Sequence, residues 1–168
     1  MATSDLTPEI VRFLLAYDPE SGQFTWIKRR GTRTDLDGNI AGSLTNEGYW
    51  KITVAGRHFL AHRLVFMHVL GRWPVGLVDH INGNRTDNRF INLREANDEL
   101  NAQNRRRART GNSSGLLGVS VNTGRGKRWK AQIKVRGQNL GLGYFDCKYE
   151  AHAAYLEAKR RLHVACTI

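Results

Sequence analysis

The chain has 168 residues, of which 40% are hydrophobic and 24% charged, a composition typical of folded globular proteins rather than disordered ones. No apolar run approaches the ~20 residues of a membrane span, and the first residues lack the layout of a secretory signal, so we expect an intracellular, cytoplasmic protein without a membrane partner. The net charge of +11 lies in the last part: residues 1–102 hold 12 Lys+Arg and 12 Asp+Glu, whereas residues 103–168 hold 14 and three. This asymmetry predicts chemistry in a neutral domain and polyanion binding in a basic one.

The first part of the chain predicts helices and strands of ordinary length. Thr7 and Pro8 are typical of a helix N-cap and first position, and Ala55-Gly56 is typical of a hairpin turn. We expect helices over 7–16 and 63–70 and strands over 23–27, 49–54 and 57–62. In the second helix we expect five apolar side chains to be largely buried: Leu64, Val65, Met67, Val69 and Leu70.

The middle of the chain predicts two antiparallel strands followed by a helix, a ββα unit. The expected elements are a strand over 77–81, a polar loop over 82–88, a return strand around 92–94 and a helix over 97–107. The small, polar stretch 109–115 is typical of a linker.

Alternating apolar residues then predict three short strands and a helix over 149–163. The fold class is therefore expected to be α+β. We predict a domain over 1–108, the linker over 109–115 and a sheet-plus-helix domain over 116–168.

Residues 79–104 contain seven asparagines and one histidine, an unusual concentration of polar side chains. Asp79 supplies a hard oxygen ligand suited to Mg²⁺, and His80 can accept a proton from water near neutral pH. On a predicted helix Asn97, Asn101 and Asn104 share one face. The segment offers no strong nucleophile, which points to metal-assisted attack by water.

The stretch "VDHINGNRTDNRFINLREANDELNAQN" resembles the HNH nuclease motif in its zinc-free form, with "NLR" twelve residues after the histidine and a further Asn nine residues later. The resemblance extends upstream over most of residues 15–105, to homing-type nucleases of phages and introns, and so implies a bacterial or phage-infected cell. It implies that His80 is the general base and that Asn92 fixes the loop that orients it. Asp79 and Asn101 would hold one divalent cation, Mg²⁺ or Mn²⁺.

Several residues near this motif keep more than one interpretation. Arg63 and Asn104 are candidates for supporting the site or contacting DNA, against a structural pair for Arg63 and a solvated position for Asn104. Asp87 and Arg89 form either an ion pair or a phosphate contact. Asn82, Asn84 and Asn88 are interpreted as turn residues. The cysteines, Cys147 and Cys166, lack zinc-knuckle spacing, so we expect no zinc.

The basic segment "GVSVNTGRGKRWKAQIKVRGQNLGLGYFDCKYEAHAAYLEAKRRLH" is similar to the Apetala-type DNA-binding domain, a three-stranded sheet packed on one helix. Alternation places Lys130, Gln132 and Lys134 opposite Trp129, which is interpreted as a core anchor rather than a sugar-phosphate contact. The predicted DNA-binding residues are Arg105, Arg106, Arg107, Arg125, Lys127, Arg128, Lys130, Lys134 and Arg136.

Together these features predict a homing-type endonuclease that acts on double-stranded DNA as a monomer, nicking one strand. Two alternatives stay open. One is a sequence-specific DNA-binding protein with an inactive nuclease scaffold, and the other is a nuclease that acts on RNA or branched DNA.

Overall fold

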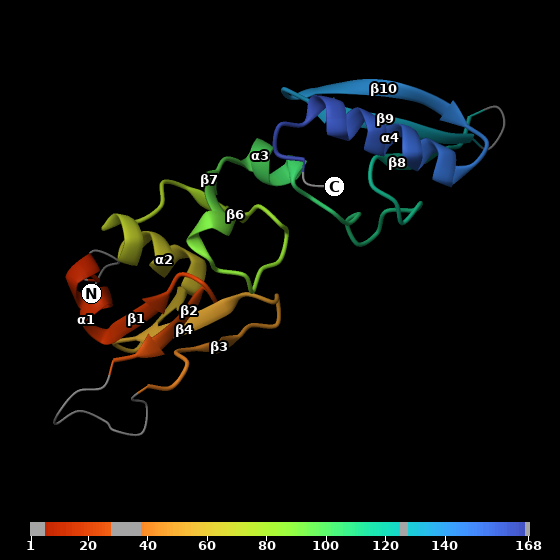
Figure 1. Cartoon of the computed structure of the whole chain (residues 1–168). Coiled ribbons are helices and arrows are strands. Elements are labelled where there is room, and N and C mark those ends of the chain that lie inside the picture. Colours follow the sequence, from red (N-terminus) through yellow and green to blue (C-terminus); the bar gives the residue numbers. More distant parts are fainter. Residues whose placement is uncertain (1–5, 28–37, 125–127, 167–168) are drawn as a thin grey trace. The chain divides into compact units, whose positions relative to one another are not determined.

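The computed structural model describes residues 6–27, 38–124 and 128–166, and the chain divides into two compact units, Met1–Ala96 and Asn97–Ile168 (Figure 1). We refer to them as the N-terminal and C-terminal units. Both combine small antiparallel sheets with helices, which confirms the α+β class. Within the described residues, no helix combines the length and apolar character that a membrane span requires.

The N-terminal unit begins with helix α1 (Pro8–Leu14), whose N-cap Thr7 accepts a hydrogen bond from Ile10 N. The expected helix to residue 16 was too long, because strand β1 (Leu15–Asp18) begins directly after α1 and pairs with β2 (Gln23–Trp26). These strands form a hairpin, and Gly22 in its turn lies against the backbone of Asn88 and Arg89.

A three-stranded antiparallel sheet and a helix complete the core of this unit. The sheet contains β3 (Ser43–Leu44), β4 (Trp50–Val54) and β5 (Arg57–Leu60), and helix α2 (Ala61–Leu70) follows at once. Leu64, Val65 and Met67 are buried as predicted. Val69 and Leu70 are exposed, contrary to expectation, because they lie in the last turn, just before the left-handed Gly71 ends the helix.

The predicted ββ hairpin is present in the N-terminal unit. Strand β6 (Leu77–His80) pairs antiparallel with β7 (Leu93–Ala96), and the short 3-10 helix η2 (Phe90–Asn92) leads into β7. In this register Asp79 lies opposite Arg94, and His80 lies opposite Leu93. The strand β6 thus ends at His80, where the polar loop starts.

Helix α3 (Asp98–Gln103) belongs to the C-terminal unit, so the division falls at Ala96/Asn97, earlier than the expected boundary at 108. The helix is also shorter than the expected 97–107, because Asn97 caps its start and Asn104 ends it. The predicted linker is ordered within the C-terminal unit: Ser114 is buried and donates a hydrogen bond to Val119 O.

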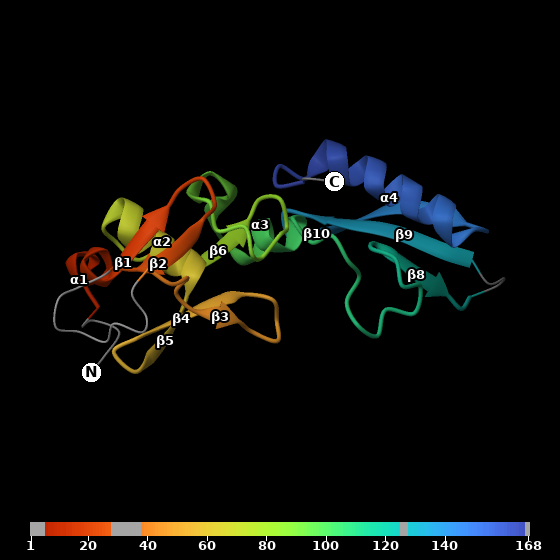
Figure 2. The same cartoon turned by 60° about the horizontal axis from the view of Figure 1, so that its bottom comes forward.

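The rest of the C-terminal unit is a sheet covered on one face by a helix. Strands β8 (Val119–Asn122), β9 (Arg128–Val135) and β10 (Gln138–Phe145) are arranged in the order β10-β9-β8, and α4 (Lys148–Leu162) runs along the sheet (Figure 2). Ala131 and Ile133 pack against α4 residues Ala151 and Tyr155. Trp129 packs against the same core, which agrees with its interpretation as a core anchor.

Candidate active site

His80 is the buried centre of the site and is held by an asparagine of its own loop. The ring Nε2 lies 3.0 Å from Asn88 Oδ1. Because an amide oxygen only accepts hydrogen bonds, Nε2 carries the proton and Nδ1 carries the lone pair. The hydrogen bond therefore selects the tautomer in which Nδ1 can act as a base.

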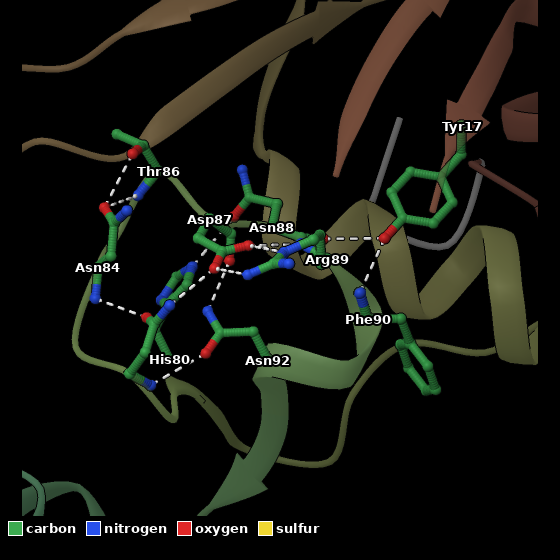
Figure 3. Close-up of polar contacts among 10 residues, drawn as sticks. Tyr17, His80, Asn84, Thr86, Asp87, Asn88, Arg89, Phe90 and Asn92 are labelled. Carbon is green, nitrogen blue, oxygen red and sulfur yellow. Dashed lines mark hydrogen bonds and ion pairs between the residues drawn. The ribbon is translucent and has the colours of Figure 1, made fainter. Parts of the chain in front are cut away.

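Asn92 joins the two ends of the polar loop. Its Oδ1 accepts a hydrogen bond from Asn82 N at 2.9 Å, and its Nδ2 donates one to Asp87 O at 2.8 Å (Figure 3). The main chain adds a third bond from Ile81 N to Asn92 O. These contacts account for an asparagine at the end of η2, just before β7, since one amide side chain satisfies a donor and an acceptor of the loop at once.

Asp87 and Arg89 form an ion pair at 2.7 Å at the end of the same loop. The hydrogen bond from Arg89 lowers the pKa of the Asp87 carboxyl to about 2. Asn82 Nδ2 donates to the same carboxylate, and Asn84 accepts from Thr86 within the loop. The dense asparagines thus serve mainly to order this turn, as the sequence suggested for Asn82 and Asn84.

The β1–β2 hairpin supports the loop from the opposite side to His80. Tyr17 OH donates to Asn88 O at 2.9 Å and accepts from Phe90 N at 2.8 Å, as Figure 3 shows. In the turn of the hairpin, a Cβ at Gly22 would lie 2.4 Å from Arg89 N. Only glycine allows the hairpin to approach the backbone of Asn88 and Arg89 so closely.

Two further aromatic rings surround His80. The ring of His62 lies edge-on to it at 5.2 Å between centroids, and the ring of Tyr49 lies at 6.2 Å. Arg85 in turn lies over Tyr49, at 4.8 Å from the ring centroid. The sequence placed His62 only at the end of the expected strand over 57–62, and no local motif indicates that β5 and α2 bring it beside His80.

Burial controls the charge of both histidines. It lowers the pKa of His62, which is 4% exposed, to about 3, and the positive charge of Arg63, or of His80 when that ring is protonated, acts in the same direction. Among the described residues the buried His62 Nδ1 has no hydrogen-bond partner. Burial also lowers the pKa of His80, although the Asn88 hydrogen bond and the charges of Asp79 and Asp87 oppose it. Both rings are therefore neutral at pH 7, as a general base must be.

Asp79 is buried next to His80 and forms an ion pair with Arg94. Arg94 donates from Nε at 3.0 Å and from Nη2 at 2.6 Å, both to Asp79 Oδ2. The carboxylate therefore already lies beside a positive charge. Arg63, a candidate near the site, donates to Gly76 O at 2.8 Å in the segment before β6, which is a structural contact.

The predicted asparagine face on the helix is not formed. Asn97 accepts a hydrogen bond from Leu100 N as the N-cap of α3, and Asn104 is buried in the C-terminal unit rather than solvated. Asn101 is exposed between them. In the described part of the chain no group of three His, Cys, Asp or Glu side chains forms a metal cluster. The carboxylate of Asp79 by itself is a hard oxygen ligand of the kind that Mg²⁺ prefers, since Mg²⁺ keeps several water ligands and binds through few protein groups.

One face of the C-terminal sheet is polar and basic. Alternation along β9 puts Lys130, Gln132 and Lys134 opposite the buried Ala131 and Ile133. Of the other predicted DNA-binding residues, Arg105, Arg106, Arg107 and Arg136 are solvent-accessible and Arg128 pairs with Asp146, whereas Arg125 and Lys127 lie outside the described residues.

Comparisons with known proteins find similarity in the middle of the chain. Residues 59–103 match a family model described as HNH endonuclease. A solved structure, described as "DNA binding and cleavage by the HNH homing endonuclease I-HmuI", is 25% identical with a TM-score of 0.41, over 54% of this chain and 50% of that one. The chain thus spans about half the length of that structure. No curated protein matches. The family match supports an HNH nuclease in this part of the chain.

Proposed function

We propose that the protein is a metal-dependent, homing-type endonuclease that cuts one strand of double-stranded DNA. The observation that carries this proposal is the hydrogen bond between His80 Nε2 and Asn88 Oδ1. It holds a neutral imidazole in the tautomer whose Nδ1 carries the lone pair, beside a buried aspartate and within the segment that matches HNH endonucleases.

In this proposal each side chain has one task. His80 Nδ1 removes a proton from the attacking water, while Asn88 and the loop held by Asn92 keep the ring in place. Asp79 and Asn101 hold a Mg²⁺ or Mn²⁺ ion. The ion, when bound, stabilises negative charge on the phosphate and its leaving oxygen. Arg94 forms an ion pair with the Asp79 carboxylate and balances the negative charge of Asp79 when no cation is bound.

The C-terminal unit is proposed to bind the DNA backbone and groove as an Apetala-type module. The support is chemical: residues 103–168 carry 14 basic and three acidic residues, and one sheet face presents Lys130, Gln132 and Lys134. A small twisted sheet of this kind can enter the major groove. With one site per chain, a monomer makes one cut.

A plasmid assay with purified full-length protein tests the function. Supercoiled plasmid is incubated with Mg²⁺ or EDTA, comparing the wild type with His80→Ala and with His58→Ala, an exposed histidine of the same unit as a control. Conversion to open circles only with metal, by the wild type and His58→Ala but not His80→Ala, is the expected result. A linear product would indicate paired sites. An alternative result is a shift in the mobility of DNA without cleavage of plasmid, branched DNA or RNA, in Mg²⁺ or in Mn²⁺. That result would reject the nuclease proposal in favour of a DNA-binding protein.

A further inference from the structure

Arg85, in the polar loop after β6, is an exposed arginine that forms no ion pair within the described part of the chain. Three other arginines of the N-terminal unit, Arg72, Arg89 and Arg94, each pair with an aspartate or a glutamate. Arg85 instead donates from Nη1 to the main-chain carbonyl of Glu47 at 2.6 Å. Its positive charge is therefore not neutralised by a paired carboxylate.

The turn between β3 and β4 holds this guanidinium. Thr45 N donates to Tyr49 O at 2.8 Å, and Tyr49 N donates to Thr45 Oγ1 at 3.2 Å, so residues 45–49 form a closed turn. The turn supplies two contacts to Arg85, the Glu47 carbonyl and the Tyr49 ring, whose centroid lies 4.8 Å from Cζ. A cation over the face of an aromatic ring is attracted by the ring electrostatically. An exposed side chain is thus held in one place by a segment distant in the chain.

The same tyrosine ring lies beside the candidate base. Its centroid is 6.2 Å from that of His80 and 5.4 Å from that of His62. Arg85 and His80 are therefore neighbours of one ring, within the N-terminal unit. Electrostatics agrees with this placement: burial lowers the pKa of His80, and the positive charge of Arg85 acts in the same direction.

The donors of Arg85 suit a phosphate. A guanidinium presents a planar fork of N–H groups that matches two oxygens of a phosphate. Nη1 is bonded to Glu47 O, whereas Nε and Nη2 have no acceptor among the described residues. Arg89 and Arg94 lie in or beside the same loop, but their donors already bind Asp87 and Asp79.

We propose that Arg85 binds the phosphate group that water attacks at His80, and that Tyr49 and the Glu47 carbonyl hold it in position for this contact. This inference rests on the proposed function, in which His80 activates that water. Negative charge increases on the phosphate oxygens as the water adds. A guanidinium held there therefore stabilises the reacting state more than the bound substrate.

The test compares Arg85→Gln with Arg57→Gln in the full chain. Arg57 carries the same charge in the same unit, but it lies opposite Val54, at the far end of the β4–β5 hairpin from Tyr49. Affinity for a linear fragment of the plasmid is measured in EDTA over a range of salt concentrations. Single-turnover nicking of supercoiled plasmid is measured in Mg²⁺ at saturating protein, and urea unfolding shows whether each variant is folded.

Arg85→Gln is expected to reduce the slope of log affinity against log salt concentration by about 0.9, the value for one phosphate. The saturated nicking rate is expected to fall by about 10²- to 10³-fold, the loss that follows when one donor to a developing negative charge is removed. Arg57→Gln should change neither. Arg85→Lys should keep the slope, because the charge remains, but should recover only part of the rate, because an ammonium group lacks the planar fork.

Equal slopes for Arg85→Gln and Arg57→Gln would overturn the inference. A reduced slope with an unchanged saturated rate would overturn it as well, because Arg85 would then bind a phosphate that does not react. If Arg85→Gln fails to fold, Arg85→Lys decides, since nicking at the wild-type rate would show that no guanidinium is needed.

The two proposals fail in different ways. If the wild type nicks no DNA in Mg²⁺ or Mn²⁺, the proposed function is wrong, and the salt dependence in EDTA still shows whether Arg85 contacts a phosphate. If the wild type nicks and His80→Ala does not, but Arg85→Gln behaves like Arg57→Gln, only the role of Arg85 is wrong.

Discussion

His80 Nε2 donates a hydrogen bond to the amide oxygen of Asn88, and both residues are buried. Eight residues separate them in the chain, and the intervening turn is closed by Asn92. The pair fixes the ring orientation and the tautomer together. A side chain interpreted from sequence as a turn residue is therefore the direct partner of the proposed base.

Replacing Asn88 by alanine should lower the cleavage rate by about 10- to 100-fold, in the range seen when a group that orients a functional histidine is lost. The Nε2 proton would lose its partner and the ring could adopt the other tautomer. Single-turnover cleavage at saturating DNA measures the effect. Asn84→Ala is the matched control, because Asn84 lies in the same loop but accepts from Thr86. Equal losses in the two variants would contradict a specific role for Asn88.

Replacing Tyr17 by phenylalanine should destabilise the N-terminal unit by about 1–3 kcal/mol, because Asn88 O and Phe90 N would both lose a partly buried partner. Cleavage should fall as well, since the loop would no longer be held on that side. Urea unfolding and the plasmid assay report the two effects. Tyr149→Phe, an exposed position on α4 of the C-terminal unit, should change neither.

The free energy of unfolding should decrease as the pH falls from about 6.5 towards 3. The pKa of His62 is lowered to about 3 by burial, so in this range the unfolded chain binds a proton that the folded chain does not. The contribution is up to about 1.4 kcal/mol per pH unit. Urea unfolding between pH 7 and 5 measures the slope, which His62→Gln should reduce. A slope that His62→Gln leaves unchanged, like that of the exposed His58→Gln, would contradict this origin.

Cleavage should remain above half of its plateau rate at pH 6.5. Burial lowers the pKa of His80 below 6.5, so the neutral base persists there, and the rate should fall only at lower pH. The measurement is a single-turnover pH profile at constant Mg²⁺. A midpoint above pH 6.5 would show that the site stabilises the charged imidazole instead.

Substituting Lys130 or Lys134 by alanine should weaken DNA binding. It should also reduce the salt dependence of affinity, by about 0.9 in log–log slope for each phosphate that the protein no longer neutralises. The cleavage rate at saturating protein should stay at the wild-type value, since neither residue belongs to the proposed reaction. Binding measured over a range of salt concentrations tests this. Lys148→Ala, at the start of α4 on the covered side of the sheet, is the control. If all three variants gave the same slope of log affinity against log salt concentration, this sheet face would not be part of the DNA interface.

Local patterns predicted the elements well, because alternation and capping are set by neighbouring residues. The ββ hairpin, the three strands of the C-terminal sheet and the helix after them follow from such patterns. Other features depend on contacts between distant parts of the chain. The burial of Asn104 and the place of His62 beside His80 depend on segments distant in the chain. Lys159 donates a hydrogen bond to Arg105 O, 54 residues away, and no periodicity encodes such an interaction.

Tyr17 and Gly22 lie outside residues 59–103, the part that matches the family, yet they support the loop of His80. A fragment cut to that match would lose the hydroxyl that joins Asn88 to Phe90 and the glycine that admits the hairpin. For protein engineering, the smallest fragment that keeps the proposed nuclease site intact therefore has to include the β1–β2 hairpin. A fragment with the motif alone would contain His80 and Asn88 but would lack the hairpin contacts that hold their loop in place.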